Sequence, residues 1–287
     1  MTPEQQDAMQ MQHEFRVKVP QRRCQKLVGM LLWASRCTRS DIAFATSRLA
    51  SAISRWEEIH NEVAKQLVGY LKRTAWQKLS FYPADPTREV LLELHTDASW
   101  HKPRSQSGHV LVRIQYDENG KDPRVLSLLD WSSSKQSLSA DSSASSELIA
   151  AHSGLRMSLP IAIGLENMLG HLHEKVRIRV RIDNEAVVQI AKTGTTKGLQ
   201  WMEAKPFCIR AGCLHDYIAF GMIEVMYVGT NDQLADLHTK ALCKVKLEAI
   251  LDKLHLHDGT PDWEVTVLKS GKPGTGEPKT GDDEKVA

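Results

Sequence analysis

The chain has 287 residues, of which 41% are hydrophobic, so it can bury a substantial core and is predicted to be globular. Its net charge of +2 is too small to require a polyanionic partner, and it permits nucleic acid without arguing for it. The five cysteines are odd in number and lack CxxC pairs. This pattern argues against a disulfide framework and a structural zinc site, and it is typical of a reducing compartment.

The N-terminal segment, 1–23, is polar and rich in Gln, and it is predicted to be flexible. It has no apolar leader, and nowhere in the chain do about 18 uncharged apolar residues follow one another. We therefore expect an intracellular protein with no membrane partner.

Three helices are predicted between residues 24 and 82. Apolar side chains recur at helical spacing over 27–34 and 42–53, and a third such pattern covers 60–72. The segment 82–87 holds two prolines among small polar residues, which neither continue a helix nor pair in a sheet. The sequence thus predicts a small helical unit over 24–82, followed by a domain boundary.

Three strand-like runs follow, at 90–96, 108–115 and 125–131. Between the second and third runs stands Asn119-Gly120, and an Asn-Gly pair is typical of a tight hairpin turn. The three runs are therefore predicted to pair as an antiparallel meander.

From residue 138 the apolar spacing becomes helical. A serine-rich stretch, 139–146, leads into a helix that Pro160 is expected to kink or end. Next, 176–182 alternates apolar residues with arginines, as a half-exposed strand does, and 184–191 continues as a helix.

The last third of the chain completes the pattern. A helix is predicted between 199 and 215, a strand over 223–228, and a final helix that opens at 230–236 and continues to about 254. The segment 257–287 is rich in Gly, Pro, Lys and acids and is predicted to be a disordered tail. The predicted class is α/β, in the order βββαβαβα with one additional helix before the last strand.

Four carboxylates stand at the ends of these elements. Asp97 ends the first strand, Glu147 opens the helix that follows, Asp183 ends the fourth strand, and Asp236 lies near the start of the last helix. Acids crowded in a core repel one another unless their pKa values rise or cations bind. Because all the ligands are oxygens, the predicted metal is Mg²⁺ or Mn²⁺. Two such ions about 4 Å apart can activate a water and stabilise the leaving oxygen of a phosphodiester.

The motifs around the acids resemble the ribonuclease H domain of copia-type LTR-retrotransposon Pol polyproteins. The matching stretches are Thr-Asp-Ala-Ser, Ser-Ser-Glu-Leu-Ile-Ala-Ala, Ile-Asp-Asn-Glu-Ala and Asn-Asp-Gln-Leu-Ala-Asp-Leu-His-Thr-Lys. The helical unit resembles the end of the reverse transcriptase of that family. The sequence departs from the family at Ser40, where Pro is usual, and at Ser145, where a second acid is usual.

The resemblance implies a ribonuclease H-like mixed five-stranded sheet over 88–256, flanked by helices and preceded by a connection-like helical unit over 24–82. It implies a two-metal endonuclease that cuts the RNA strand of RNA-DNA hybrids, with Mg²⁺ held by Asp97, Glu147, Asp183 and Asp236. The implied partners are the hybrid and the upstream reverse transcriptase part of a polyprotein. The implied place of action is the cytoplasm, the nucleus or a virus-like particle.

Several polar residues near the acids are of the kinds that contact phosphate, sugar or the 2′-hydroxyl. The candidates for substrate binding are Ser99, Ser105, Gln106, Lys135 and Asn184.

Three alternatives remain open at this point. The chain could be a catalytically decayed nucleic-acid-binding fragment of a polyprotein, or a DNA-directed nuclease on the same fold. Asp232 is a rival for the fourth ligand, since it precedes Asp236 by about one helical turn. Asp236 is favoured because it lies inside the matched Leu-Ala-Asp stretch.

Overall fold

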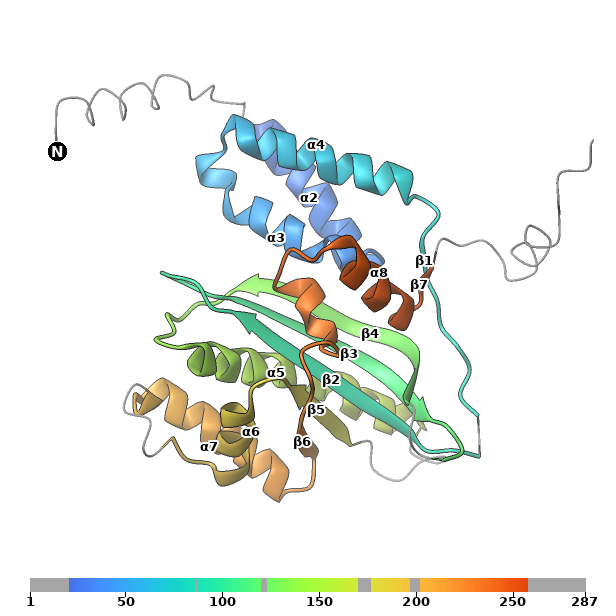
Figure 1. Ribbon diagram of the computed structural model, residues 1–287, viewed down its shortest axis with the longest axis vertical. Coiled ribbons are helices and arrows are strands. Elements are labelled where there is room, and N and C mark those ends of the chain that lie inside the picture. The colour runs from blue at the N-terminus through green and yellow to red at the C-terminus, as the bar shows by residue number, and fades with distance from the viewer. Residues whose placement is uncertain (1–20, 86, 120–122, 170–176, 197–201, 258–287) are drawn as a thin grey trace, which may run out of the picture.

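The structure is a computed structural model that describes residues 21–85, 87–119, 123–169, 177–196 and 202–257 (Figure 1). Most of the predicted N-terminal segment and nearly all of the predicted tail therefore lie outside the described residues.

Five strands form one mixed sheet. They are β2 (Val90–Ser99), β3 (Gln106–Tyr116), β4 (Pro123–Lys135), β5 (Ile178–Ile182) and β6 (Ile223–Tyr227), in the order β4-β3-β2-β5-β6. The first three pair antiparallel, whereas β5 lies parallel to β2 and β6 parallel to β5. The predicted meander and the predicted α/β class are confirmed. The strands are longer than the predicted apolar runs, because pairing continues into polar residues such as Gln106 opposite Lys135.

Helices cover both faces of this sheet (Figure 1). On one face lie α5 (Ser143–Leu169), α6 (Glu185–Thr193) and α7 (Lys205–Ala219), packed on the apolar side chains of β2 and β5. On the other face lie α3 (Ala43–Ser51), the short 3-10 helix η4 (Leu234–His238) and α8 (Lys244–Lys253). The sheet thus lies between two apolar cores.

The three helices predicted before residue 82 are present as α2 (Gln21–Cys37), α3 and α4 (Glu58–Arg73). They share a core of their own around Val28, Ile42 and Leu49. The unit also contacts the sheet, since the Trp131 indole N–H donates to the Ser35 carbonyl at 2.6 Å. A two-stranded ladder, β1 (Lys78–Leu79) with β7 (Leu256–His257), joins the connecting segment to the end of the described chain. The division into domains remains a prediction.

The structure corrects two expectations about helix ends, namely that Pro160 could end its helix and that the final helix runs unbroken to about residue 254. Helix α5 does not end at Pro160 but continues to Leu169. Pro160 has no N–H for the carbonyl of Arg156, yet both residues are exposed, so water can take that carbonyl. The predicted final helix is broken into η4 and α8, and Thr239 between them donates a hydrogen bond to Asp97 on β2.

Among the described helices, α5 is long and apolar enough, by length and composition alone, to cross a membrane. Its Leu148 and Leu155 are fully buried against the sheet. A core helix of a soluble protein passes the same test, so this feature is weak evidence of a membrane span.

Candidate metal centre

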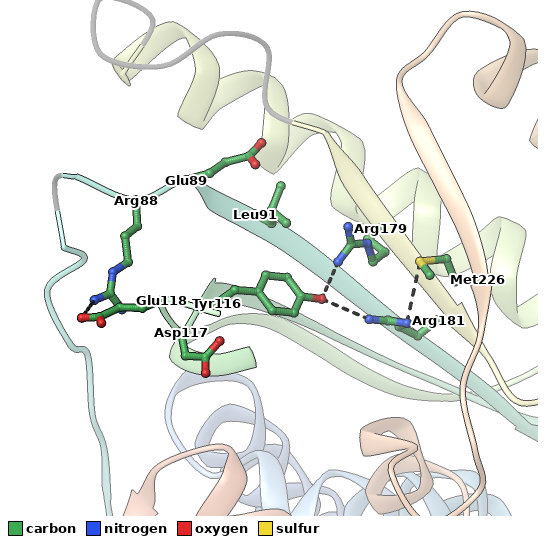
Figure 2. Close-up of a pocket in the computed structure, with 9 residues that line it drawn as sticks. All are labelled: Arg88, Glu89, Leu91, Tyr116, Asp117, Glu118, Arg179, Arg181 and Met226. Carbon is green, nitrogen blue, oxygen red and sulfur yellow. Dashed lines mark hydrogen bonds and ion pairs between the residues drawn. The ribbon is translucent and has the colours of Figure 1, made fainter. Parts of the chain in front are cut away.

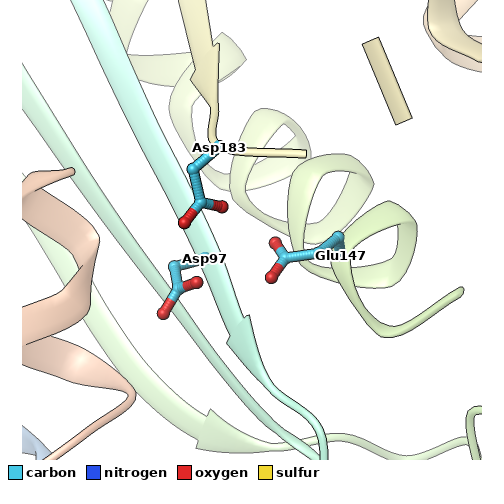
Figure 3. A group of neighbouring side chains, drawn as sticks. All are labelled: Asp97, Glu147 and Asp183. Atoms are coloured by element: carbon cyan, nitrogen blue, oxygen red, sulfur yellow. The ribbon is translucent and has the colours of Figure 1, made fainter. Parts of the chain in front are cut away.

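Three acids from three elements meet at one edge of the sheet (Figure 3). Asp97 lies near the end of β2, Asp183 directly follows β5, and Glu147 lies in the first turns of α5. Each offers one carboxylate oxygen, and the three atoms lie within 4.8 Å of one another. β2 and β5 are parallel neighbours, so their ends reach the same edge of the sheet, and α5 points its N-terminal turns at that edge.

The serine-rich stretch positions Glu147 by starting α5 at a fixed residue. The Ser142 N–H donates to the Ser145 hydroxyl at 3.0 Å, and the Ser145 N–H donates to the Ser142 hydroxyl at 3.1 Å. This reciprocal pair is a capping box, which satisfies backbone donors at the helix start. Ser145, the departure from the family pattern, is therefore part of the helix cap.

Glu147 is buried and only half satisfied. Its Oε1 accepts a hydrogen bond of 3.0 Å from the backbone N–H of Ala98, which fixes the carboxylate beside Asp97. Its Oε2 is buried and has no hydrogen-bond partner among the described residues. A buried carboxylate oxygen without a donor is costly, so this oxygen marks a position for a cation or a proton.

Asp236 lies on η4 and approaches Asp97 from the other face of the sheet. Its side chain is 1% exposed, and its two oxygens accept from Lys240 at 2.7 Å and Lys246 at 2.5 Å. The rival, Asp232, has a 70% exposed side chain that pairs with Lys253. The structure therefore brings Asp236, and not Asp232, beside the acid cluster.

The crowding of the acids changes their protonation. Burial, together with Asp97 and Asp183, raises the pKa of Glu147 well above its ordinary value. Burial and Asp97 raise the pKa of Asp183 to about 6. Burial also raises the pKa of Asp97, although Lys240 and Thr239 oppose the rise. Raised pKa values are expected for crowded carboxylates, which need either protons or cations to offset their mutual repulsion.

The residues present fit a hard divalent cation. Asp97, Glu147 and Asp183 supply only oxygen ligands, one of them an orphaned buried atom, and no His or Cys joins this cluster among the described residues. Such a donor set favours ions of the Mg²⁺, Mn²⁺ and Ca²⁺ type.

The predicted substrate-binding residues fall into two groups. Ser99 and Asn184 are half-buried and Lys135 is exposed, and Asn184 also caps α6 by accepting from the Val187 N–H. Ser105 and Gln106 are buried: Ser105 accepts from the His101 N–H, and Gln106 donates to Ser47 and Ser133. The roles of all five stay predictions, and we leave the two buried residues out of the proposed substrate surface.

The two lysines around Asp236 were not predicted as part of the site. The available signal was spacing, since Lys240 follows Asp236 by four residues, as an i,i+4 ion pair requires. Lys246 gave no such signal because it reaches Asp236 only across the break between η4 and α8.

Gly108 allows η4 to approach the sheet closely enough to place Asp236. It pairs with Asp97 across the ladder, and a Cβ at Gly108 would lie 2.7 Å from the His238 Cβ and 2.8 Å from the Thr239 Cγ2. We expect Gly108→Ala to lower the free energy of unfolding by about 1–3 kcal/mol through overpacking, measured by urea denaturation.

Gly29→Ala is the matched control, because nothing lies within 4 Å of a Cβ at that helical glycine. It should raise the free energy of unfolding by about 0.5–1 kcal/mol. If Gly108→Ala were equally stabilising, η4 would not pack on β3 as described.

His238 makes the stability of the fold depend on pH. Its side chain is fully buried beside the Ser40 backbone, yet neither ring nitrogen makes a well-formed hydrogen bond within the described part of the chain. Burial and nearby His109 lower the pKa of His238 from 6.5 to about 3. The unfolded chain therefore binds a proton that the folded chain does not, and the stability contributed by neutral His238 is lost as pH falls from about 6.5 through 3.

Between pH 7 and pH 5 this loss amounts to about 2 kcal/mol. We expect His238→Leu to reduce the difference in free energy of unfolding between these pH values by about that amount. Urea denaturation of both proteins at both pH values measures it, and an unchanged difference would show that His238 does not titrate on unfolding.

One groove beside the start of β2 lies away from the acids. This groove has a volume of about 670 Å³. Arg179 and Arg181, which line it, both reach the Tyr116 hydroxyl (Figure 2). Both arginines have acidic partners, Glu224 for Arg179 and Glu93 for Arg181. This groove lies toward the start of β2, whereas the acids lie at its end, so its paired charges do not extend the metal centre.

Comparisons with known proteins agree with the motifs. The chain is 25% identical over 237 residues to the retrovirus-related Pol polyprotein of transposon TNT 1-94 from Nicotiana tabacum, a match over 80% of this chain and 16% of that protein's length. This finding confirms the resemblance to retrotransposon Pol polyproteins, and the chain spans about a sixth of the relative's length. No family model matches the chain.

Similar solved structures include ribonuclease H domains. A foamy viral protease-reverse transcriptase in complex with an RNA/DNA hybrid has a TM-score of 0.45 at 16% identity, covering 85% of this chain and 28% of that chain. An N-terminal ribonuclease H domain from Mycobacterium tuberculosis has a TM-score of 0.34 at 12% identity, covering 57% of this chain and 98% of that chain. Ribonuclease H1 from Halobacterium salinarum also has a TM-score of 0.34, at 14% identity, covering 50% of this chain and 89% of that chain.

Proposed function

We propose that this protein is a retrotransposon-type ribonuclease H that hydrolyses the RNA strand of RNA-DNA hybrids internally, with two Mg²⁺ ions or with Mn²⁺ in their place. The observation that carries the proposal is the convergence of Asp97, Glu147 and Asp183, three acids far apart in sequence, within 4.8 Å. The motif resemblance and the tobacco relative support the choice of nuclease class.

In this proposal Asp97, Glu147, Asp183 and Asp236 hold the ions. Bound Mg²⁺ would supply an activated water and charge stabilisation at the leaving oxygen of the phosphodiester. The chain's own contribution is rigidity: the Ala98 N–H holds Glu147 and the Thr239 hydroxyl holds Asp97. Fixed carboxylates need little rearrangement when the reacting groups arrive.

The substrate surface proposed for this site uses the residues that solvent can reach. Lys135 is exposed at the end of β4, and Ser99 and Asn184 are half-buried next to the acid-bearing ends of β2 and β5. A lysine and small polar side chains are suited to contacting the sugar-phosphate backbone. We propose that an RNA-DNA hybrid is the ligand and that, inside the cell, the upstream part of a Pol polyprotein is the protein partner.

The direct test is cleavage by the full chain. We expect a hybrid with labelled RNA to be cut at internal positions with Mg²⁺, to stay intact with EDTA, and to be cut in preference to matched RNA and DNA duplexes. Salt-dependent binding of the hybrid without metal-dependent cleavage would select the decayed binding fragment instead. Preferential cleavage of the DNA duplex would select a DNA-directed nuclease.

A further inference from the structure

One ammonium group of the chain bridges two of the acids. Lys240 Nζ lies 2.7 Å from Asp236 Oδ1 and 3.3 Å from Asp97 Oδ2, and both acids have side chains that are 1% exposed. The Lys240 side chain is 37% exposed, so it reaches solvent although its ammonium group pairs with two buried carboxylates. The chain thus places a cation of its own where two acids approach each other.

The four acids Asp97, Glu147, Asp183 and Asp236, together called the acid pocket below, therefore form two unlike halves. In the half formed by Asp97 and Asp236, Lys240 and Lys246 occupy both oxygens of Asp236. In the half formed by Asp97, Glu147 and Asp183, the three acids lie within 4.8 Å and Glu147 Oε2 has no hydrogen-bond partner among the described residues. Lys240 pairs with Asp97 where the two halves meet, and among the described residues neither Glu147 nor Asp183 has an ion-pair partner.

The net charge of the four carboxylates and the two lysines indicates how many divalent ions the acids can hold. Four ionised carboxylates carry −4, and the two ammonium groups reduce the local charge to −2, which a single divalent ion balances. A second divalent ion would face two ammonium groups at ion-pairing distance from its ligand Asp236. Like charges at such distances oppose binding by a large factor in a partly buried site.

We propose that Lys240 is a positioning residue that occupies the Asp97–Asp236 half of the pocket and limits the substrate-free protein to one tightly bound divalent ion. This inference rests on the proposed function, since it concerns the same acids. A second ion then enters only when the Lys240 ammonium leaves, and its exposed stem allows it to turn toward solvent, where a phosphate backbone would attract it.

The test counts bound ions without nucleic acid. The full chain, stripped of metal, is titrated with Mn²⁺, and the free ion is followed by electron paramagnetic resonance. We expect one tight site in the wild type and two in Lys240→Met, with the second site tightened at least about tenfold. Lys240→Arg keeps the positive charge and should restore the single site.

Lys253→Met is the matched control, because Lys253 pairs with the exposed Asp232 outside the pocket, and it should bind Mn²⁺ as the wild type does. Without metal, Lys240→Met should also melt at a lower temperature than the wild type and recover when Mn²⁺ is added. One site of equal affinity in wild type and Lys240→Met, or two in both, would overturn the proposal and leave the nuclease assignment intact. Failure of both proteins to bind Mn²⁺ would overturn the proposal and the nuclease assignment together.

Discussion

An Asp97→Asn substitution is expected to lower the rate of hybrid cleavage by about 10³-fold or more while the protein stays folded, because charge stabilisation worth several kcal/mol depends on this carboxylate. Asp97 is the acid that both halves of the pocket share. It lies in the cluster with Glu147 and Asp183, and it contacts Lys240 on its other side. Asn keeps the shape of the side chain and removes its charge, so the loss concerns the chemistry more than the packing.

The fold should tolerate this change. Burial raises the pKa of Asp97, which means that the ionised form is disfavoured in the folded protein, and the neutral amide removes that penalty. Single-turnover cleavage of labelled hybrid measures the rate, and circular dichroism with thermal unfolding confirms the folded state of the variant.

Asp232→Asn is the control for removing one negative charge near η4. Asp232 is exposed and pairs with Lys253, so this substitution should change the cleavage rate by less than about twofold, as expected for a screened surface charge. Equal rates in wild type and Asp97→Asn would contradict the assignment of the acid cluster as the reacting site.

The sequence was informative about Asp97, Glu147 and Asp183 for a physical reason. Each acid lies at the end or the start of a strongly periodic element. Parallel neighbouring strands such as β2 and β5 end at the same edge of the sheet, whatever the length or course of the loops between them. Capping chemistry is also local, so the serines before Glu147 could be expected to start a helix within a residue or two.

The sequence was less informative wherever a side chain's partners lie far along the chain. The apolar pattern from 230 to 254 favours one helix, but the structure has two, and Thr239 between them donates a hydrogen bond to the distant Asp97. Ser105 and Gln106 stand near the acids in sequence, yet tertiary contacts bury both, as when the Gln136 N–H donates to the Ser105 carbonyl at 2.8 Å. Sequence proximity to a candidate catalytic acid therefore does not show which way a polar side chain faces.

Trp131→Ala is expected to lower the free energy of unfolding by about 3–5 kcal/mol, the largest stability loss that we predict. Trp131 lies on β4, is 6% exposed, and packs in the core between the sheet and the helices above it. Its indole N–H donates to the Ser35 carbonyl at 2.6 Å, and its own carbonyl accepts from Arg36 at 3.0 Å. Removing the ring leaves a cavity, and it leaves the Ser35 carbonyl without its indole donor at the junction with α2.

Trp33→Ala separates burial from residue type, because Trp33 lies two residues before Ser35 on α2 and is 72% exposed. It should change the free energy of unfolding by no more than about 0.5 kcal/mol. The loss of free energy of unfolding in Trp131→Phe should lie between those of the two alanine variants, since Phe keeps much of the packing and loses the hydrogen bond. Urea denaturation followed by circular dichroism measures all three, and equal losses for both alanine variants would mean that the helical unit does not pack on the sheet. A second unfolding transition appearing only in Trp131→Ala would show that this contact is what makes the helical unit and the sheet unfold together.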